Sequence, residues 1–247
     1  MREYDAIFKM YENEGIIKRV DTIDDPGNPG EVHYLPHRPV VKYERETTKV
    51  RPVFDASAKS RGPSLNDCLY TGPCLLNHIF GIILRFRMYL IGICSDIKQA
   101  FLNIGVSEEH QNYLRFIWFN DPFEKYLETV TYKFARVLFG LAPSPFLLNA
   151  TVETHIRSYD GKEKLLAEKL LRDLYVDDST AGVKSVNEGI QFYKFAKRAM
   201  KEGGFDLTKW CTNSLELMEL IGKQCMQGKM FKRGVSYKFG KQNRTGT

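Results

Sequence analysis

The fold is decided by the stretch LLRDLYVDDSTAGV, residues 170–183, in which an apolar run leads into two adjacent aspartates and then into a second apolar run. Residues 170–176 predict a strand, because they are rich in large apolar side chains. Residues 179–183 predict its hairpin partner, since Ser, Thr and Gly after the aspartates suit a tight reversal. Such a turn can present Asp177 and Asp178 together at one edge of a sheet, although a straight strand would point them to opposite faces.

A third aspartate ends another apolar segment. Residues 89–96 predict a buried strand that finishes at Asp96. If this strand lies beside the hairpin, three carboxylates converge, and like charges so close together require a cation. Oxygen ligands suit Mg²⁺, and two such ions can activate an attacking 3′-hydroxyl and neutralise a leaving pyrophosphate. The pattern favours nucleotidyl transfer, although a lone pair of aspartates is more often a solvated turn or a helix cap.

The remaining elements surround these two strands. Apolar residues at helical spacing predict helices, and runs of β-branched and aromatic residues predict strands. The predicted helices span residues 3–20, 75–86, 145–159 and 185–202. The other predicted strands span residues 32–35, 40–43, 50–54, 113–119, 126–138 and 205–210. This order predicts an α+β fold with an antiparallel, ferredoxin-like sheet backed by helices.

Composition is that of an ordinary globular protein, with 247 residues, 43% hydrophobic and 27% charged. Such a chain forms one domain or two packed subdomains. The most apolar stretch, residues 75–97, is broken by His78, Arg85 and Arg87, which argues against a membrane span. The N-terminus lacks the apolar segment of a signal peptide, and the five cysteines have no CxxC spacing. We therefore expect an intracellular protein with reduced thiols.

Charge is distributed unevenly along the chain. The net charge is +6, and residues 38–61 contain seven basic side chains against three acidic ones. Residues 223–247 contain seven basic side chains and no Asp or Glu. Both segments could contact phosphate groups, so the distribution permits binding of a nucleic acid without proving it.

Seven motifs, in order, resemble the reverse transcriptases of LTR retrotransposons, most closely those of the BEL/Pao group. They are YLPH (residues 34–37), KVRPVFDAS (49–57), SLNDCL (64–69), SDIKQAF (95–101), FGLAPSPF (139–146), YVDD (175–178) and KW (209–210). The resemblance covers roughly residues 4–214. Each motif alone is moderately specific, and their order makes the set strong.

The resemblance implies the fingers and palm of a right-hand polymerase. Residues 1–88 would form the N-terminal segment and part of the fingers, and residues 89–214 the palm, with a fingers insertion around 107–138. Residues 215–247 are expected to be a basic, disordered tail. We expect a fragment of a longer polyprotein, since a thumb and an RNase H domain would need more residues than follow the palm.

The resemblance also assigns the reaction chemistry. Asp96, Asp177 and Asp178 match the metal-binding triad, with the backbone carbonyl of Ile97 as a further ligand of two Mg²⁺ ions or, alternatively, Mn²⁺. Lys209 matches a lysine that can protonate the pyrophosphate as a general acid.

Substrate contacts are assigned by the same motifs. The matched positions are Lys49, Arg51, Phe101, Phe139, Gly140 and Tyr175. Lys49 and Arg51 would grip the incoming triphosphate, for which a guanidinium is suited by its bidentate geometry. Phe101 would act as a steric gate against a 2′-hydroxyl, and Gly140 would let the backbone approach the nascent base pair.

The expected partners are an RNA or DNA template with its primer and deoxynucleoside triphosphates, without a membrane and with the oligomeric state left open. The expected location is the cytoplasm, with virus-like particles or the nucleus as alternatives. Two other readings remain. One is a truncated, non-catalytic relic that at most binds nucleic acid. The other is a palm-fold RNA polymerase, against which the bulky Phe101 argues.

Overall fold

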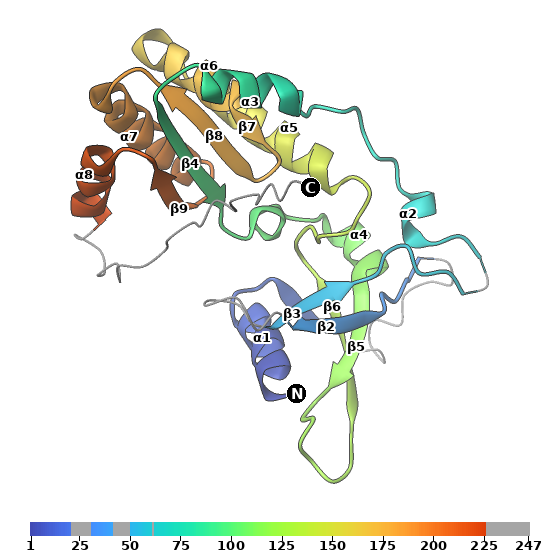
Figure 1. Cartoon of the computed structure of the whole chain (residues 1–247). Helices are drawn as coiled ribbons and strands as arrows, with labels where there is room; N and C mark the ends of the chain where they lie inside the picture. The colour runs from blue at the N-terminus through green and yellow to red at the C-terminus, as the bar shows by residue number, and fades with distance from the viewer. Residues whose placement is uncertain (21–30, 42–49, 61, 226–247) are drawn as a thin grey trace, which may run out of the picture.

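A computed structural model describes residues 1–20, 31–41, 50–60 and 62–225 of the chain. Within these ranges the backbone forms two sheet regions, each with its own hydrophobic core. The larger region carries several helices along one face, and the smaller one contains the N-terminal helix (Figure 1). The α+β fold with antiparallel sheets that the sequence predicts is confirmed.

The smaller region combines one helix with two antiparallel sheets. Its elements are α1 (Arg2–Asn13), β1 (Ile17–Val20), β2 (His37–Val41), β3 (Val50–Phe54), β5 (Arg115–Phe119) and β6 (Thr129–Phe134). The strands are ordered β1-β6-β5 in one sheet and β2-β3 in the other. Aromatic rings fill the core, where Phe8, Phe116 and Phe134 are buried, because large rings remove the most apolar area from water.

The larger region is a four-stranded antiparallel sheet whose helices lie mainly on one face (Figure 1). Its strands are β4 (Ile91–Ile97), β7 (Leu174–Tyr175), β8 (Asp178–Val183) and β9 (Leu207–Thr212). Its helices are α3 (Ile79–Arg87), α5 (Ser144–Ile156), α6 (Lys164–Arg172), α7 (Val186–Glu202) and α8 (Leu215–Cys225). The short connecting helices are α2 (Leu65–Cys68), α4 (Glu108–Gln111), η1 (Ala100–Asn103), η2 (Asn112–Leu114) and η3 (Gly161–Glu163). The strand order is β7-β8-β4-β9.

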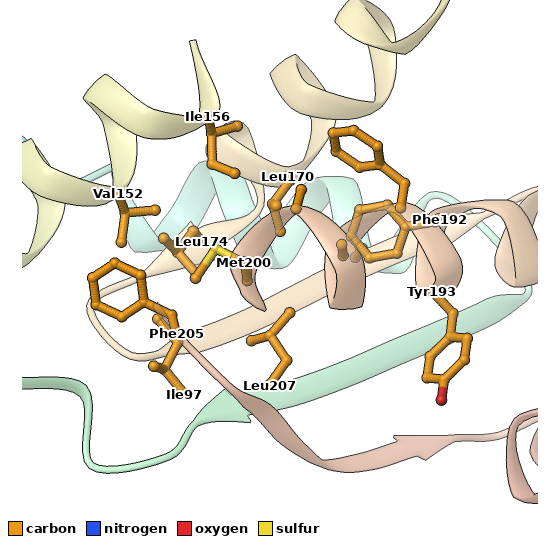
Figure 2. Packing of buried hydrophobic residues seen from close by; sticks show 14 of the residues in the cluster. Ile97, Val152, Ile156, Leu170, Leu174, Phe192, Tyr193, Met200, Phe205 and Leu207 are labelled. Carbon is orange, nitrogen blue, oxygen red and sulfur yellow. The ribbon is translucent and has the colours of Figure 1, made fainter. Parts of the chain in front are cut away.

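Alternation along β4 separates a packed face from a polar one. Ile93 and Ile97 are buried against α5, α6 and α7, whereas Cys94 and Asp96 belong to the opposite face. Figure 2 shows Ile97 of β4 and Leu207 of β9 beneath the apolar side chains of the helices. The face that carries Asp96 is therefore the one left for chemistry.

Most predicted elements are confirmed to within a few residues. These are the strands around residues 89–96, 113–119, 126–138 and 205–210 and the helices around 145–159 and 185–202. Helix α7 begins as its capping signal predicts, since the Ser185 hydroxyl accepts the Glu188 N–H at 3.2 Å.

The prediction of one helix over residues 3–20 is wrong beyond Asn13. Gly15 adopts φ +66°, a left-handed conformation that ends helices. The chain then continues as β1, in which Ile17 pairs with Phe134 of β6. The apolar residues after Gly15 fit a strand as well as a helix, so their spacing does not distinguish the two.

The prediction that residues 170–176 form a strand is wrong over most of its length. Helix α6 takes the first part of this range, and β7 retains only Leu174–Tyr175. Leu170 is fully buried on the apolar face of the helix, and the Asp173 N–H still donates to the Lys169 carbonyl at 3.0 Å. A short apolar run can be buried equally well in either conformation.

The helix predicted as buried over residues 75–86 begins only at Ile79, and only Ile82 of α3 is buried. Before this helix, the Asn77 side chain donates to the carbonyl oxygens of Leu171 in α6 and Leu174 in β7, at 2.7 and 3.0 Å. Like every other helix in the described ranges, α3 is too short or too polar to cross a lipid bilayer.

The prediction of a disordered tail over residues 215–247 is wrong where α8 forms. Leu217 and Ile221 are spaced by one helical turn and are buried in the larger core. The Ser214 hydroxyl accepts the Leu217 N–H at 3.3 Å and so caps the helix. Residues 226–247 lie outside the described residues.

Candidate active site

The strands that carry the predicted aspartates are neighbours. Asp96 and Asp178 are Cα partners across β4 and β8, so their side chains leave the same face of the sheet. The Ile97 N–H donates to the Asp177 carbonyl at 2.8 Å and so ties the end of β4 to the hairpin turn. The structure thus brings all three aspartates to one edge of the sheet.

The turn between β7 and β8 is strained. Tyr175 and Asp178 are Cα partners, which leaves only Val176 and Asp177 between the two strands. Val176 has φ +54°, a conformation that two-residue turns usually give to glycine. A β-branched residue held there costs about 1–3 kcal/mol. The packing around the hairpin must therefore hold the aspartates in place against this strain.

An irregularity in β9 directs Lys209 toward Asp96. Cys94 pairs with Cys211 but Asp96 pairs with Thr208, so β9 contains one extra residue, which forms a β-bulge. Lys209 lies in this bulge with φ +52°, and its Nζ is 2.5 Å from Asp96 Oδ2. Because the lysine side chain is 66% exposed, the ion pair positions the ammonium more than it stabilises the fold.

Unusual backbone conformations gather around these residues. The non-glycine residues with positive φ in the described ranges are Gln99, Val176 and Lys209. Gln99 follows Asp96 by three residues, and Val176 directly precedes Asp177. Strained backbone conformations occur mostly at functional sites, where the surrounding packing holds the residue in place despite the energetic cost.

The carboxylates repel one another. Burial raises the pKa of Asp178, and the charges of Asp177 and Asp96 raise it further, while Lys209 lowers it. Burial is the largest of these causes and the two neighbouring carboxylates add to it, so the charge of Lys209 does not cancel their combined effect.

Replacing Asp178 by asparagine is expected to raise the melting temperature at neutral pH without divalent cations. A group with a raised folded-state pKa contributes stability below its unfolded pKa, and this contribution is lost as the pH rises through the folded pKa. The ionised carboxylate therefore destabilises the folded protein at neutral pH. The higher melting temperature of D178N should disappear in acid, where Asp178 of the wild type is protonated. Scanning fluorimetry over this pH range measures it. A lower melting temperature of the variant at neutral pH would contradict the expected repulsion.

The oxygen donors at this edge suit a hard divalent cation, because carboxylates and backbone carbonyls are the ligands that Mg²⁺ prefers. Within the described ranges, no three His, Cys, Asp or Glu side chains are already gathered as a metal-binding group. Asp96 and Asp178 are therefore the pair whose positions fit a shared cation, with Asp177 adjacent in the turn. In this structure Lys209 supplies the positive charge beside Asp96.

Two aromatic rings lie next to β4. Phe101, in η1, is 3% exposed, and Phe139, which is 66% exposed, packs edge-on against it with ring centroids 4.4 Å apart. The predicted gate residue is thus covered by a second ring. Of the two rings, Phe139 is the one that faces solvent.

Gly140 is fixed in a conformation that only glycine adopts readily. Its φ is +96°, and a Cβ would approach the Phe54 carbonyl oxygen to 3.3 Å. Asn66 holds this loop, since its Nδ2 donates to the Gly140 carbonyl and its Oδ1 accepts the Ala142 N–H, both at 2.8 Å. The sequence did not single out Asn66, although it lies within the SLNDCL motif.

Arg51, one of the two residues predicted to contact the triphosphate, is not brought to the aspartates. Arg51 is exposed on β3, where its charge opposes the burial-driven rise in the pKa of Tyr11. In the part of the chain that the structure describes, no contact joins Arg51 to the carboxylates, and Lys49 lies outside that part. Tyr175, in contrast, is the Cα partner of Asp178.

A buried ion cluster, which the sequence does not predict, supports the β7–β8 hairpin. The Asp173 side chain is 1% exposed and accepts Arg85 Nε and Lys169 Nζ, each at 3.1 Å. Its carbonyl accepts the Thr180 N–H at 2.8 Å. The only signal in the sequence is a charged residue inside an apolar run. The cluster links α3, α6 and the β7–β8 hairpin.

Two comparisons with known proteins agree with this geometry. A family model described as reverse transcriptase (RNA-dependent DNA polymerase) matches residues 61–213, a range that includes the three aspartates and Lys209. The comparison with curated protein sequences returned no match.

Solved structures of a foamy viral protease–reverse transcriptase share the fold. One, in complex with double-stranded DNA, has 18% sequence identity and a TM-score of 0.59 over 80% of this chain and 28% of that one. Another, in complex with an RNA/DNA hybrid, has 16% identity and a TM-score of 0.61 over 85% of this chain and 24% of that one. The chain therefore spans about a quarter of the length of these relatives.

Proposed function

Because this chain belongs to the reverse transcriptase (RNA-dependent DNA polymerase) family, we propose that it carries out RNA-directed DNA synthesis, joining deoxynucleotides to a primer 3′-hydroxyl. The observation that carries the proposal is the pairing of Asp96 with Asp178 across β4 and β8, with Lys209 on Asp96. This places two carboxylates and one ammonium at a single edge, which are the groups that nucleotidyl transfer requires.

Divalent cations, Mg²⁺ or Mn²⁺, supply activation of the attacking hydroxyl and neutralise the charge of the departing pyrophosphate when they are bound. Asp96, Asp177 and Asp178 would hold two such ions, with the backbone carbonyl of Ile97 as a further ligand. The contribution of the chain is to hold Asp96 and Asp178 as strand partners, with Asp177 adjacent in the turn, in spite of the repulsion between their charges. The raised pKa of Asp178 supports this, because the charges of Asp177 and Asp96 add to the larger effect of burial.

Lys209 is the residue that we assign to proton transfer. Its ammonium lies 2.5 Å from Asp96 and is largely exposed, so it remains accessible to a substrate phosphate. Donation of a proton to the pyrophosphate oxygen as the bond to the α-phosphorus breaks would make the leaving group less basic.

Template, primer and nucleotide are assigned to the two sheet regions. We assign residues 1–88, with the insertion around 107–138, to the fingers and residues 89–214 to the palm. Lys49 and Arg51 of the fingers would contact the triphosphate, with Tyr175, Phe139 and Gly140 of the palm close to the nucleotide. The net charge of +6 supports an RNA or DNA template as partner, since basic side chains bind phosphate.

Replacing Phe101 by valine is expected to raise ribonucleotide use relative to deoxynucleotide use by about 10–200-fold, because space opens where a 2′-hydroxyl would clash. The ratio of the two incorporation rates is the appropriate measurement, since it is insensitive to loss of folded protein. F119V in β5 is a matched aromatic control. If the ratio changes in F139V but not in F101V, the gate is Phe139, whose ring is the exposed one.

Primer extension tests the proposed function itself. A labelled DNA primer annealed to an RNA template is incubated with the protein, deoxynucleotides and Mg²⁺. Stepwise extension that a chelator abolishes is the expected result. Binding of the same primer–template is measured in parallel.

Nucleic-acid binding without catalysis is the second candidate function. It is favoured by the net charge of +6, because basic side chains bind phosphate groups without a cation site. Binding that weakens steeply with salt, without incorporation, would support it. Efficient incorporation would exclude it.

The finer assignment is to the BEL/Pao group of LTR retrotransposons, with a location in the cytoplasm, in virus-like particles or in the nucleus. It rests on the order of the seven motifs between residues 34 and 210. The surrounding genomic reading frame tests it, since a protease before this segment and RNase H and integrase after it are expected.

A further inference from the structure

Two thiols that the proposed reaction does not use lie on the same face as the aspartates. Cys94 and Cys211 are Cα partners across β4 and β9. Cys94 precedes Asp96 by two residues, so both project from the same face of β4. Both thiols are free and half-buried, and neither belongs to the hydrophobic cores described above.

The geometry of the pair suits a covalent bond between the sulfurs. Paired residues of antiparallel strands have Cα atoms about 4.5–5.5 Å apart, and disulfides span Cα separations of about 4.4–6.8 Å. Because the register already pairs the two residues, the bond requires no slip of either strand.

The two thiols also differ in their place in the sheet. Cys211 lies on β9, the edge strand, whereas Cys94 lies on β4 between β8 and β9. Interaction with the Cys94 thiol lowers the pKa of Cys211, although burial opposes this. Cys211 is therefore the thiol that we expect to react first, since the thiolate is the form that attacks disulfides.

We propose that Cys94 and Cys211 form a reversible disulfide on the catalytic face, with a low-molecular-weight disulfide such as oxidised glutathione as the oxidant. Cys211 Sγ attacks one glutathione sulfur, which releases one glutathione thiolate and leaves a mixed disulfide. Cys94, after losing its proton to solvent, attacks Cys211 Sγ and releases the second glutathione thiolate. Two protein thiols are oxidised and one glutathione disulfide is reduced to two thiols.

The disulfide would act on the active site through the bulge. Lys209 lies in the extra residue between the Cys94–Cys211 pair and the Asp96–Thr208 pair. A covalent bond at one end of this bulge restrains β9 where its backbone must hold Lys209 at φ +52°. Bringing the two sulfurs to a bonding distance of about 2.05 Å changes the side-chain geometry at this end of the bulge without a slip of register, and we expect the Lys209 ammonium to shift away from Asp96. This consequence, unlike the disulfide itself, rests on the proposed function.

The thiol chemistry is tested without reference to activity. The full chain with Cys68, Cys74 and Cys225 replaced by serine is treated with oxidised glutathione while folded. Loss of both remaining thiols is expected, together with a disulfide that joins tryptic peptides 88–98 and 210–223. Adding C211S gives the matched control, which can form no such bond. Retention of both thiols, or two stable glutathione adducts without the cross-link, would overturn the proposal.

Primer extension forms the second arm. The extension rate of the oxidised protein is expected to be at most about a tenth of that of the reduced protein, since small displacements of reacting groups slow a reaction by such factors. Reduction with dithiothreitol should restore the rate. The C211S control should be insensitive to the oxidant. Unchanged activity of fully cross-linked protein would overturn the coupling to Lys209. If the cross-link forms but neither redox state extends primers, the proposed function fails and the disulfide stands.

Discussion

Replacing Asp96 by asparagine is expected to lower primer extension by about a thousandfold, which corresponds to about 4 kcal/mol of lost transition-state stabilisation. Asp96 is the Cα partner of Asp178 and the ion-pair partner of Lys209, so the change removes a charged oxygen from both interactions. Asparagine keeps the shape of the side chain, and therefore the fold should survive. Single-nucleotide incorporation under saturating substrate measures the loss.

The matched control is D160N, an exposed aspartate in the connection after α5, which should extend primers like the wild type. Circular dichroism and the melting temperature establish that both variants are folded. Equal extension by D96N and the wild type would remove Asp96 from the catalytic group and with it the assigned cation site.

Replacing Asp173 by alanine is expected to lower the free energy of unfolding by about 3 kcal/mol, because it leaves the largely buried Lys169 ammonium and the half-buried Arg85 without their counter-charge. Asp173 is 1% exposed, and Lys169, one of its two partners at 3.1 Å, has a side chain only 12% exposed. The loss should also loosen the hairpin, since Arg85 of α3 reaches it through this carboxylate. Urea unfolding gives the measurement.

Two variants separate charge from packing at this position. D173N keeps the size and one acceptor oxygen, so it should fall between the wild type and D173A. D160A removes an exposed carboxylate and should change stability by less than about 0.5 kcal/mol. A change of that small size in D173A would mean that the ion cluster does not support the hairpin.

The sequence predicts the edge that carries the aspartates better than the elements around it. The strand ending at Asp96 follows from a local pattern, because an apolar strand has a strong local signal. The reversal predicted after Asp178 lies instead at Val176 and Asp177, since Asp178 already begins β8. The pairing of these strands follows only from the chemistry of converging carboxylates and from the resemblance. Nothing in the residues alone sets their register.

What the sequence does not predict depends on tertiary contacts. The bulge that holds Lys209 arises from a mismatch between β4 and β9 and has no local signal. The end of α6 is set by burial of Asp173 among cations that come from α3 and α6. Helix α8 was mistaken for a tail because the basic residues after it dominate the composition, whereas Leu217 and Ile221 lie against α7 and the larger core.

The left-handed backbone of Val176 lowers the stability of the hairpin but restricts the positions of the aspartates beside it. Selection for a more stable chain would replace this valine by glycine, which adopts the same backbone without strain. Glycine would also widen the range of conformations open to the turn, and with it the positions of the two aspartates that follow. With valine at this position the hairpin is less stable, but the two aspartates are held in a narrower range of positions. Valine is therefore expected to be retained as long as the reaction depends on those positions.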